Sequence, residues 1–170
     1  MSTTLRLNDL IHQAEQGAWD LYEGKLTPHR SCGISLAELY GHETRPYQSL
    51  RRGGITGDGQ CGAIKAGELL LGEVFGDPDP TGMVTDTLRS AMLRYRELWQ
   101  ERVDKGAATS IICNDLTGQF AAFQSPERHH FCTQIASTVS GCIAQVMAEH
   151  GVMPELHLPP EVVSARLRGR

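Results

Sequence analysis

The spacing of the apolar residues is the feature that most constrains how this chain can fold. From Leu7 to Tyr22, apolar side chains recur at steps of three and four residues, which places them on one face of a helix. The same spacing returns in 61–76, 81–105 and 126–150, and no segment shows the alternation of a strand or a hairpin turn. The sequence therefore predicts an all-α fold, a compact bundle of about six helices.

Turn and capping residues predict where these helices begin and end. The predicted helices span about 7–23, 31–41, 61–76, 81–105, 114–123 and 126–150. Ser31 is a candidate N-cap, and so is Asp79, since a proline follows it at the first helical position. Ser125, also followed by proline, predicts the start of the last large helix.

The chain is short enough for one domain, which we place at 1–170. The helix 61–76 is apolar nearly all round, which predicts a central, buried position. A glycine-rich loop, 42–60, precedes it, and long loops of this kind are often functional. Several prolines follow residue 150, so we predict an extended C-terminal tail at 151–170, with a helical turn after the last of them.

Composition and charge exclude several classes of protein. Apolar residues make up 40% and charged residues 21%, which is typical of a globular chain. The net charge of −4 and the dispersed basic residues argue against a nucleic-acid partner. The N-terminus lacks the apolar segment of a secretory signal, and no stretch reaches the ~18 apolar residues of a membrane span. We therefore expect a cytoplasmic protein with no membrane partner.

Five cysteines need another explanation in the cytoplasm, where stable disulfides are rare. Four of them lie at or near predicted helix starts: Cys32, Cys61, Cys113 and Cys132. A helix N-terminus carries partial positive charge and free N–H donors, so we expect it to favour the thiolate form. Cys142 lies on the apolar stripe of the last large helix, which indicates a buried structural residue.

The cysteine spacing excludes the familiar local motifs. No C-x-x-C pair occurs, so neither a thioredoxin-like pair, a zinc knuckle nor a ferredoxin run is present. Any shared site would have to be assembled from four separate helices. From the residues alone, metal binding, thiol redox chemistry and simple burial all remain open.

The order of the four cysteines resembles that of a bacterial and archaeal family of probable redox-active proteins, named for the pattern C, GCAxxG, C, C. Residues 61–67 read C-G-A-I-K-A-G after G-D-G-Q, Cys32 begins C-G-I-S-L-A, and Cys113 and Cys132 begin C-N-D-L-T-G and C-T-Q-I. The resemblance covers roughly residues 10–148. Gln60 stands where the family has glycine, and Cys142 lies outside the pattern.

The resemblance implies a cofactor, because a related domain of split-Soret cytochromes is associated with a non-haem iron–sulfur centre. It implies a [2Fe–2S] or [4Fe–4S] cluster held by the four family cysteines, in electron transfer, sensing or cluster handling. Glycine N–H groups can bond to cluster sulfurs, and the residues we expect to contact the cofactor are Gly53, Gly54, Gly59 and Gly62. Arg45, Arg51 and Arg52 would offset its negative charge.

Three alternatives remain at this stage. The same cysteines could exchange thiols and disulfides without metal, or bind zinc with help from one of His129 and His130. The chain could also be a structural or partner-binding helical module. No catalytic residue is predicted. We expect a redox partner protein and a homodimer, for which the helix 81–105 offers an amphipathic face.

Overall fold

The computed structural model describes residues 3–169, and within that range the chain folds into seven α-helices and one 3-10 helix, with no strand. The helices are α1 (Thr3–Glu23), α2 (Gly33–Leu39), α3 (Gly62–Phe75), α4 (Asp86–Arg102), α5 (Cys113–Thr117), α6 (Pro126–Glu149) and α7 (Pro160–Arg168), with the 3-10 helix η1 (Arg45–Leu50) between α2 and α3. The predicted all-α class is confirmed, and about six helices is close to the observed number.

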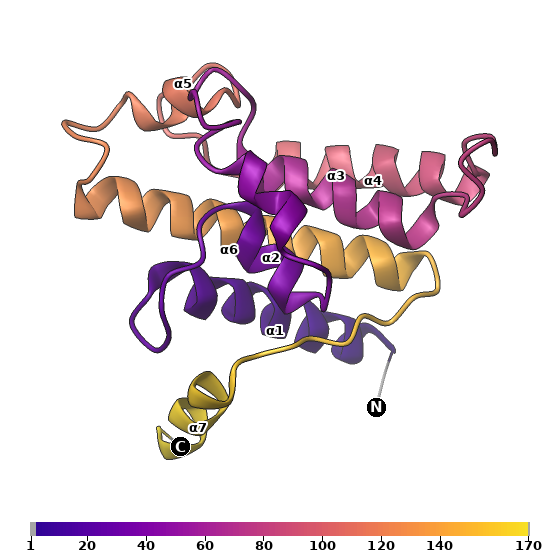
Figure 1. Cartoon of the computed structure of the whole chain (residues 1–170). Coiled ribbons are helices and arrows are strands. Elements are labelled where there is room, and N and C mark those ends of the chain that lie inside the picture. The colour runs from indigo at the N-terminus through magenta and orange to yellow at the C-terminus, as the bar shows by residue number, and fades with distance from the viewer. Residues whose placement is uncertain (1–2, 170) are drawn as a thin grey trace.

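The bundle is built from two antiparallel helix pairs (Figure 1). The helices α1 and α6 lie side by side and run in opposite directions, and α3 and α4 form the second pair. The short helix α2 contacts α1, α3, α6 and η1. Because α6 contacts both members of the other pair as well as α1 and α2, it is the helix around which the bundle is packed.

The apolar stripes predicted from sequence form the core. In α1, Ala14, Ala18 and Leu21 are fully buried, and in α6, Val139 and Ile143 are fully buried. Small residues in α6 let α1 approach closely, since a Cβ added to Gly141 would meet the Glu15 side chain at 2.6 Å. By length and composition α6 could cross a membrane, but 72% of its most apolar window is buried inside the bundle, as in the core helix of a globular protein.

Two of the predicted helix starts are wrong. The helix α4 begins after Thr85, whose hydroxyl accepts a hydrogen bond from the Leu88 N–H at 3.0 Å, and not after Asp79. Asp79 instead closes a turn, where its carboxylate accepts hydrogen bonds from Thr81. The N-cap of α2 is Cys32, not Ser31. The prediction for α6 is confirmed, because the Ser125 hydroxyl accepts from the Arg128 N–H.

The predictions for α5 and for the C-terminal segment also differ from the structure. The helix expected at 114–123 is only the five-residue α5, which Gly118 ends. The C-terminal segment is extended up to Pro159 and then forms the nine-residue α7, where the sequence predicted an extended tail with only a helical turn. The extended part passes the C-terminal end of α2, where the His157 N–H donates to the Leu39 carbonyl at 2.7 Å.

Glycines on α3 allow close approach, as their number suggested. A Cβ on Gly67 would meet the Tyr95 hydroxyl of α4 at 2.1 Å, and that hydroxyl donates a buried hydrogen bond to the Ile64 carbonyl at 2.8 Å. A Cβ on Gly62 would meet the Leu50 carbonyl oxygen at 2.2 Å. Gly72 is different, because nothing lies within 4 Å of the position of its Cβ.

Candidate functional site

The four cysteines at the helix starts line one small cavity. Its volume is about 30 Å³, which is close to the room that one water molecule takes in the liquid. The other lining residues are Tyr22, Gly62, Ala63, Leu116, Thr117 and Ile135. Cysteines that are up to 100 positions apart in sequence, Cys32 and Cys132, are therefore neighbours, and the fifth cysteine, Cys142, is not among them.

Cys32 lies close to the start of α3 because the residue at that start is a glycine, Gly62. Cys32 is the N-cap of α2 and adopts a positive φ of 47°, which side chains other than glycine seldom adopt. The Ser35 hydroxyl donates to the Cys32 carbonyl at 2.8 Å and supports this turn. Only glycine fits at position 62, since its Cβ would lie 3.0 Å from the Cys32 Cβ and clash with the Leu50 carbonyl.

Cys61 and Cys113 are positioned by backbone hydrogen bonds between two loops. The Cys61 N–H donates to the Ile111 carbonyl at 2.7 Å, and the Cys113 N–H donates to the Gly59 carbonyl at 2.9 Å. Gln60 and Ile112 form an isolated antiparallel bridge at this point. The end of the glycine-rich loop therefore pairs with the segment just before α5. Cys61 follows the loop on one side of this contact, and Cys113 begins α5 on the other.

Cys132 lies in the second turn of α6 and faces the cavity from the side of α1. The Arg128 side chain and the Tyr22 hydroxyl lie near its sulfur, and both lower the pKa of the thiol against the larger effect of burial. Of the two histidines just before it, His129 lines the neighbouring larger cavity, while His130 packs against Trp19 with ring centroids 5.4 Å apart. The adjacent histidines therefore point to different sides of α6, as their spacing predicted.

The four glycines predicted to contact the cofactor differ in how close they lie to the cysteines. Gly62 lines the cysteine cavity, and a Cβ on Gly53 would meet the Cys113 Cβ at 2.5 Å. Gly59 supplies the carbonyl that holds Cys113, and its N–H donates to the Gly53 carbonyl. Gly54 has φ 72° and no neighbour within 4 Å of a Cβ position, and it lines neither cavity beside the cysteines.

Burial has the largest effect on the pKa of each of the four thiols. It raises the pKa of Cys32 to about 11 and the pKa of Cys61 to about 12, and it raises the pKa of Cys113 and Cys132. Hydrogen bonds act in the opposite direction, from backbone groups at Ala63 and Ile64 to Cys61 for example, but they are the smaller effect. The expectation that helix-start positions favour the thiolate is therefore wrong for the chain without a bound metal, whose thiols stay protonated at neutral pH.

A second cavity of about 370 Å³ adjoins the first and shares Cys32, Cys113 and Cys132 with it. Its charged and titratable lining residues besides the cysteines and Tyr22 are Arg51, Arg52, Arg128, His29 and His129, and no carboxylate lines it. The guanidinium groups of Arg52 and Arg128 lie over the ring of Phe123, at 4.9 and 4.3 Å from its centroid. This cavity is therefore suited to negative charge.

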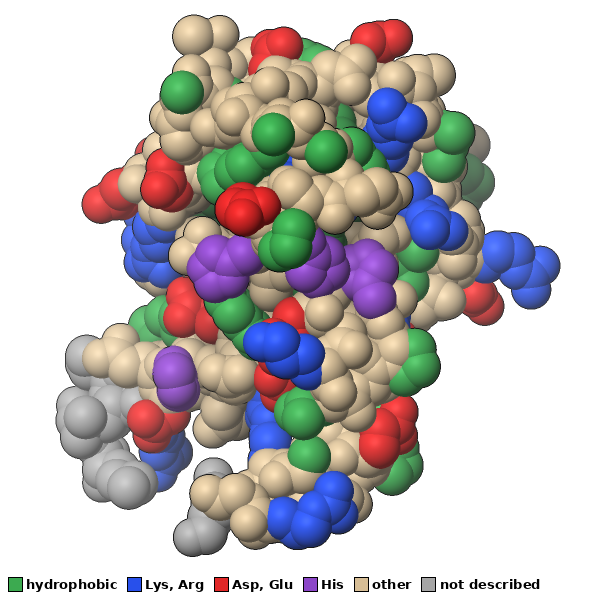
Figure 2. Space-filling view, turned by 90° about the vertical axis from the view of Figure 1, so that its left-hand side faces the viewer, with side chains coloured by type: hydrophobic (Ala, Val, Ile, Leu, Met, Phe, Trp, Pro, Cys, Tyr) green, Lys and Arg blue, Asp and Glu red, His purple; other side chains and the backbone are tan. Residues whose placement is uncertain are grey.

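The histidines of this site gather on one end of the molecule. Figure 2 views the end that lies on the left of Figure 1, where the start of α6 and the loop after α1 meet, and histidine side chains lie next to one another across this face. The rings of His29 and His129 have centroids 5.1 Å apart, and both contact Tyr22. The loop after α1 and the start of α6 thus form one continuous surface beside the cysteines.

Of the basic groups that line the larger cavity, the sequence indicated Arg51, Arg52 and His129 but not Arg128 and His29. Arg45, expected to offset cofactor charge, is not among the residues that line either cavity. Arg128 takes that place, and a signal for it existed, because it lies four residues before Cys132 on the same helix face. His29 and Tyr22 carried no such signal, since only the packing of α1 against α6 brings them to Cys132.

Within residues 3–169, no group of three or more His, Cys, Asp or Glu side chains is arranged to hold a single metal ion. The thiols surround a cavity without meeting at one point. Neither a protein-family model, a curated protein nor a solved structure matches the chain. The resemblance to the redox-active cysteine family thus stays a prediction, and the site must be interpreted from its own geometry.

Proposed function

We propose that Cys32, Cys61, Cys113 and Cys132 bind an iron–sulfur cluster and that the protein works in electron transfer, sensing or cluster handling. One observation carries this proposal: four thiols from four separate helices line the same cavity, whereas Cys142 does not. Four cysteine thiolates are the usual ligand set of [2Fe–2S] and [4Fe–4S] clusters. Simple burial of cysteine in a core gives no reason for this convergence.

The surroundings suit an anionic cofactor. A cluster with four thiolate ligands is negatively charged, and three arginines with no carboxylate line the cavity next to the thiols. This larger cavity also provides volume that the small one lacks, and three of the four cysteines border it. Polar groups near the sulfurs, the backbone at Ala63 and Ile64 for Cys61 and the Arg128 side chain for Cys132, are of the kind that tunes a cluster's reduction potential.

The raised thiol pKa values favour a cluster over metal-free thiol chemistry. The attacking species in thiol–disulfide exchange is the thiolate, and burial raises the pKa of all four thiols. Metal binding overcomes the same burial by displacing the protons. Zinc has less support, because within the described residues no three ligand side chains converge on a single ion.

The first test is the absorption spectrum of protein purified without oxygen, with iron and acid-labile sulfide assayed on the same sample. We expect a brown protein that contains iron and sulfide in equal amounts. Cys61→Ala should lose most of the absorbance, and the matched control Cys142→Ala should keep it. A protein that stays colourless and free of iron after anaerobic reconstitution would contradict the proposal.

A further inference from the structure

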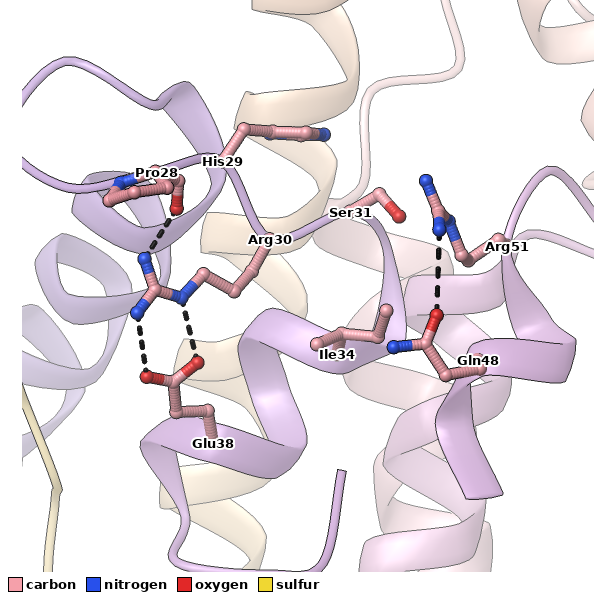
Figure 3. A pocket seen from close by; sticks show the side chains of 8 residues that line it. All are labelled: Pro28, His29, Arg30, Ser31, Ile34, Glu38, Gln48 and Arg51. Atoms are coloured by element: carbon pink, nitrogen blue, oxygen red, sulfur yellow. Dashed lines mark hydrogen bonds and ion pairs between the residues drawn. The ribbon is translucent and has the colours of Figure 1, made fainter. Parts of the chain in front are cut away.

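A third cavity lies beside the cysteine site on the outer face of α2 and η1 (Figure 3). Its volume is about 350 Å³. It shares His29, Ser31 and Arg51 with the cavity that the cysteines border. A ligand held by these three residues would therefore lie next to the thiols, although neither the proposed function nor the resemblance requires any ligand there.

The charge in this outer cavity comes from Arg51. Glu38 is the one carboxylate among its lining residues, and the Arg30 guanidinium already neutralises it through hydrogen bonds of 2.8 and 3.0 Å. Arg51 has only a long hydrogen bond, 3.5 Å, to the Gln48 amide oxygen, and no carboxylate of the described residues pairs with it. Its exposed guanidinium is free to bind an anion.

A second group in the cavity lacks a partner of its own. The Ser31 hydroxyl oxygen is buried and has no hydrogen-bond partner among the described residues, and in Figure 3 it lies on the side of the cavity where Arg51 enters. A buried hydroxyl without a partner is unfavourable, so a bound ligand would relieve a real deficit. Its position beside Arg51 suits the oxygen of an anion.

His29 adds an acceptor. Its Nδ1 bonds to the Tyr22 carbonyl oxygen, which can only accept, so Nδ1 carries the ring proton. Burial lowers the pKa of His29 more than the hydrogen bond to the Tyr22 carbonyl raises it, and the nearby His129 and Arg128 lower it further, so the ring is neutral near pH 7. The remaining nitrogen, Nε2, then has a free lone pair for a hydroxyl proton.

We infer that the outer cavity binds a small oxyanion that also carries an O–H group, such as hydrogen phosphate or a 2-hydroxycarboxylate. Arg51 pairs with the anionic oxygens, Ser31 donates a hydrogen bond to one of them, and His29 Nε2 accepts from the O–H group. Sulfate and acetate carry similar charge but have no proton to donate at neutral pH. The cavity should therefore bind hydrogen phosphate more tightly than sulfate, or a 2-hydroxycarboxylate such as glycolate more tightly than acetate.

The test is a calorimetric titration of the full chain, as purified, with inorganic phosphate, sulfate, glycolate and acetate at pH 7.5. We expect phosphate or glycolate to bind more tightly than its partner anion, and the tighter of the two identifies the ligand class. Arg51→Gln should weaken that binding at least about tenfold, since hydrogen bonds to charged groups are the strong ones. Arg45→Gln, an exposed arginine of η1 outside this cavity, should leave it unchanged.

Two results would overturn the inference. One is the absence of saturable binding of phosphate and glycolate up to about 10 mM, an affinity too weak for a built site. The other is equal weakening in Arg51→Gln and Arg45→Gln, which would show only general attraction to positive charge. Iron assayed on the same sample keeps this result separate from the cluster proposal, because the anion contacts involve no cysteine.

Discussion

The two cysteines of α6 show how differently the same residue can be used on one helix. Cys132, in the second turn, borders two cavities and lies beside three other cysteines. Cys142, ten residues later, is fully buried among the apolar residues that pack α6 into the core. Burial raises the pKa of both thiols, to about 11 for Cys142.

Burial and thiol acidity therefore do not separate a candidate functional cysteine from a structural one in this protein. The neighbours do. Around Cys132 the start of α6 meets α1, α5 and the glycine-rich loop, and each contributes polar or sulfur-bearing groups. In the middle of α6, the buried neighbours from α1 and α3 are mostly apolar, and no second cysteine is among them, although the Arg102 and Glu15 side chains come near enough to affect the pKa of Cys142.

The largest expected effect is on metal content, where the two cysteines should behave in opposite ways. Cys132→Ala removes one of four proposed ligands and should abolish most iron binding while leaving the fold intact. Cys142→Ala should keep the iron and lower the free energy of unfolding by about 1 kcal/mol through lost core packing. Iron assay and chemical denaturation of both variants check this, and equal iron in the two would remove the distinction.

Thiol reactivity should sharpen the comparison. Without metal, a pKa raised from 9.0 to about 11 leaves Cys32 roughly 100-fold less thiolate than a free cysteine near pH 7.5, so alkylation should be slow and should speed up as pH rises. Cys132 should react before the fully buried Cys142. Bound metal should then protect Cys132 and leave Cys142 unchanged, which mass spectrometry of the alkylated peptides can follow. Fast labelling of all thiols at pH 7.5 would contradict the burial argument.

Two glycines of α3 extend the comparison from cysteines to backbone packing. Gly62→Ala places a Cβ against the Leu50 carbonyl beside the cysteine cavity and should destabilise the protein by about 2 kcal/mol. Gly72→Ala meets nothing within 4 Å and should stabilise it by up to about 1 kcal/mol through higher helix propensity. Denaturant unfolding of metal-free protein measures both. Equal effects at the two positions would mean that the start of α3 is not closely packed.

The smallest expected effect concerns the end of α6 farthest from the cysteines. Arg94 of α4 holds Glu149 with hydrogen bonds of 2.8 and 3.2 Å and lowers the pKa of that carboxyl. This contribution to stability is present above the ordinary pKa of 4.5 and is lost as pH falls through the lowered value, by up to about 1 kcal/mol for a partly exposed pair.

Glu149→Gln should remove that part of the acid sensitivity of unfolding. Glu97→Gln is the matched control, because Glu97 is more exposed and lies 3.4 Å from the same arginine. If both variants retain the full pH dependence, the pair does not stabilise the end of the bundle.

Much of the fold follows from local sequence signals. The long helices α1, α3 and α6 were predicted to within a few residues, because each has a strong apolar stripe and a glycine or a capping residue at its end. The start of α4 was missed because Asp79-Pro80 forms a turn that imitates a helix start, and the true cap, Thr85, is bonded to the Phe75 carbonyl of the preceding helix. The contact with Phe75, ten residues earlier, cannot be read from the residues next to Thr85.

The sequence by itself determined the helical class, the positions of four cysteines at or near helix starts and the burial of Cys142, since these follow from periodicity and local capping. Only the tertiary structure decided that those cysteines share a cavity, that Arg128 and His29 lie beside them, and that their thiols are protonated. The reason is physical: pKa and convergence depend on desolvation and on neighbours from other helices, and the packing of α1, α2, α3 and α6 supplies both.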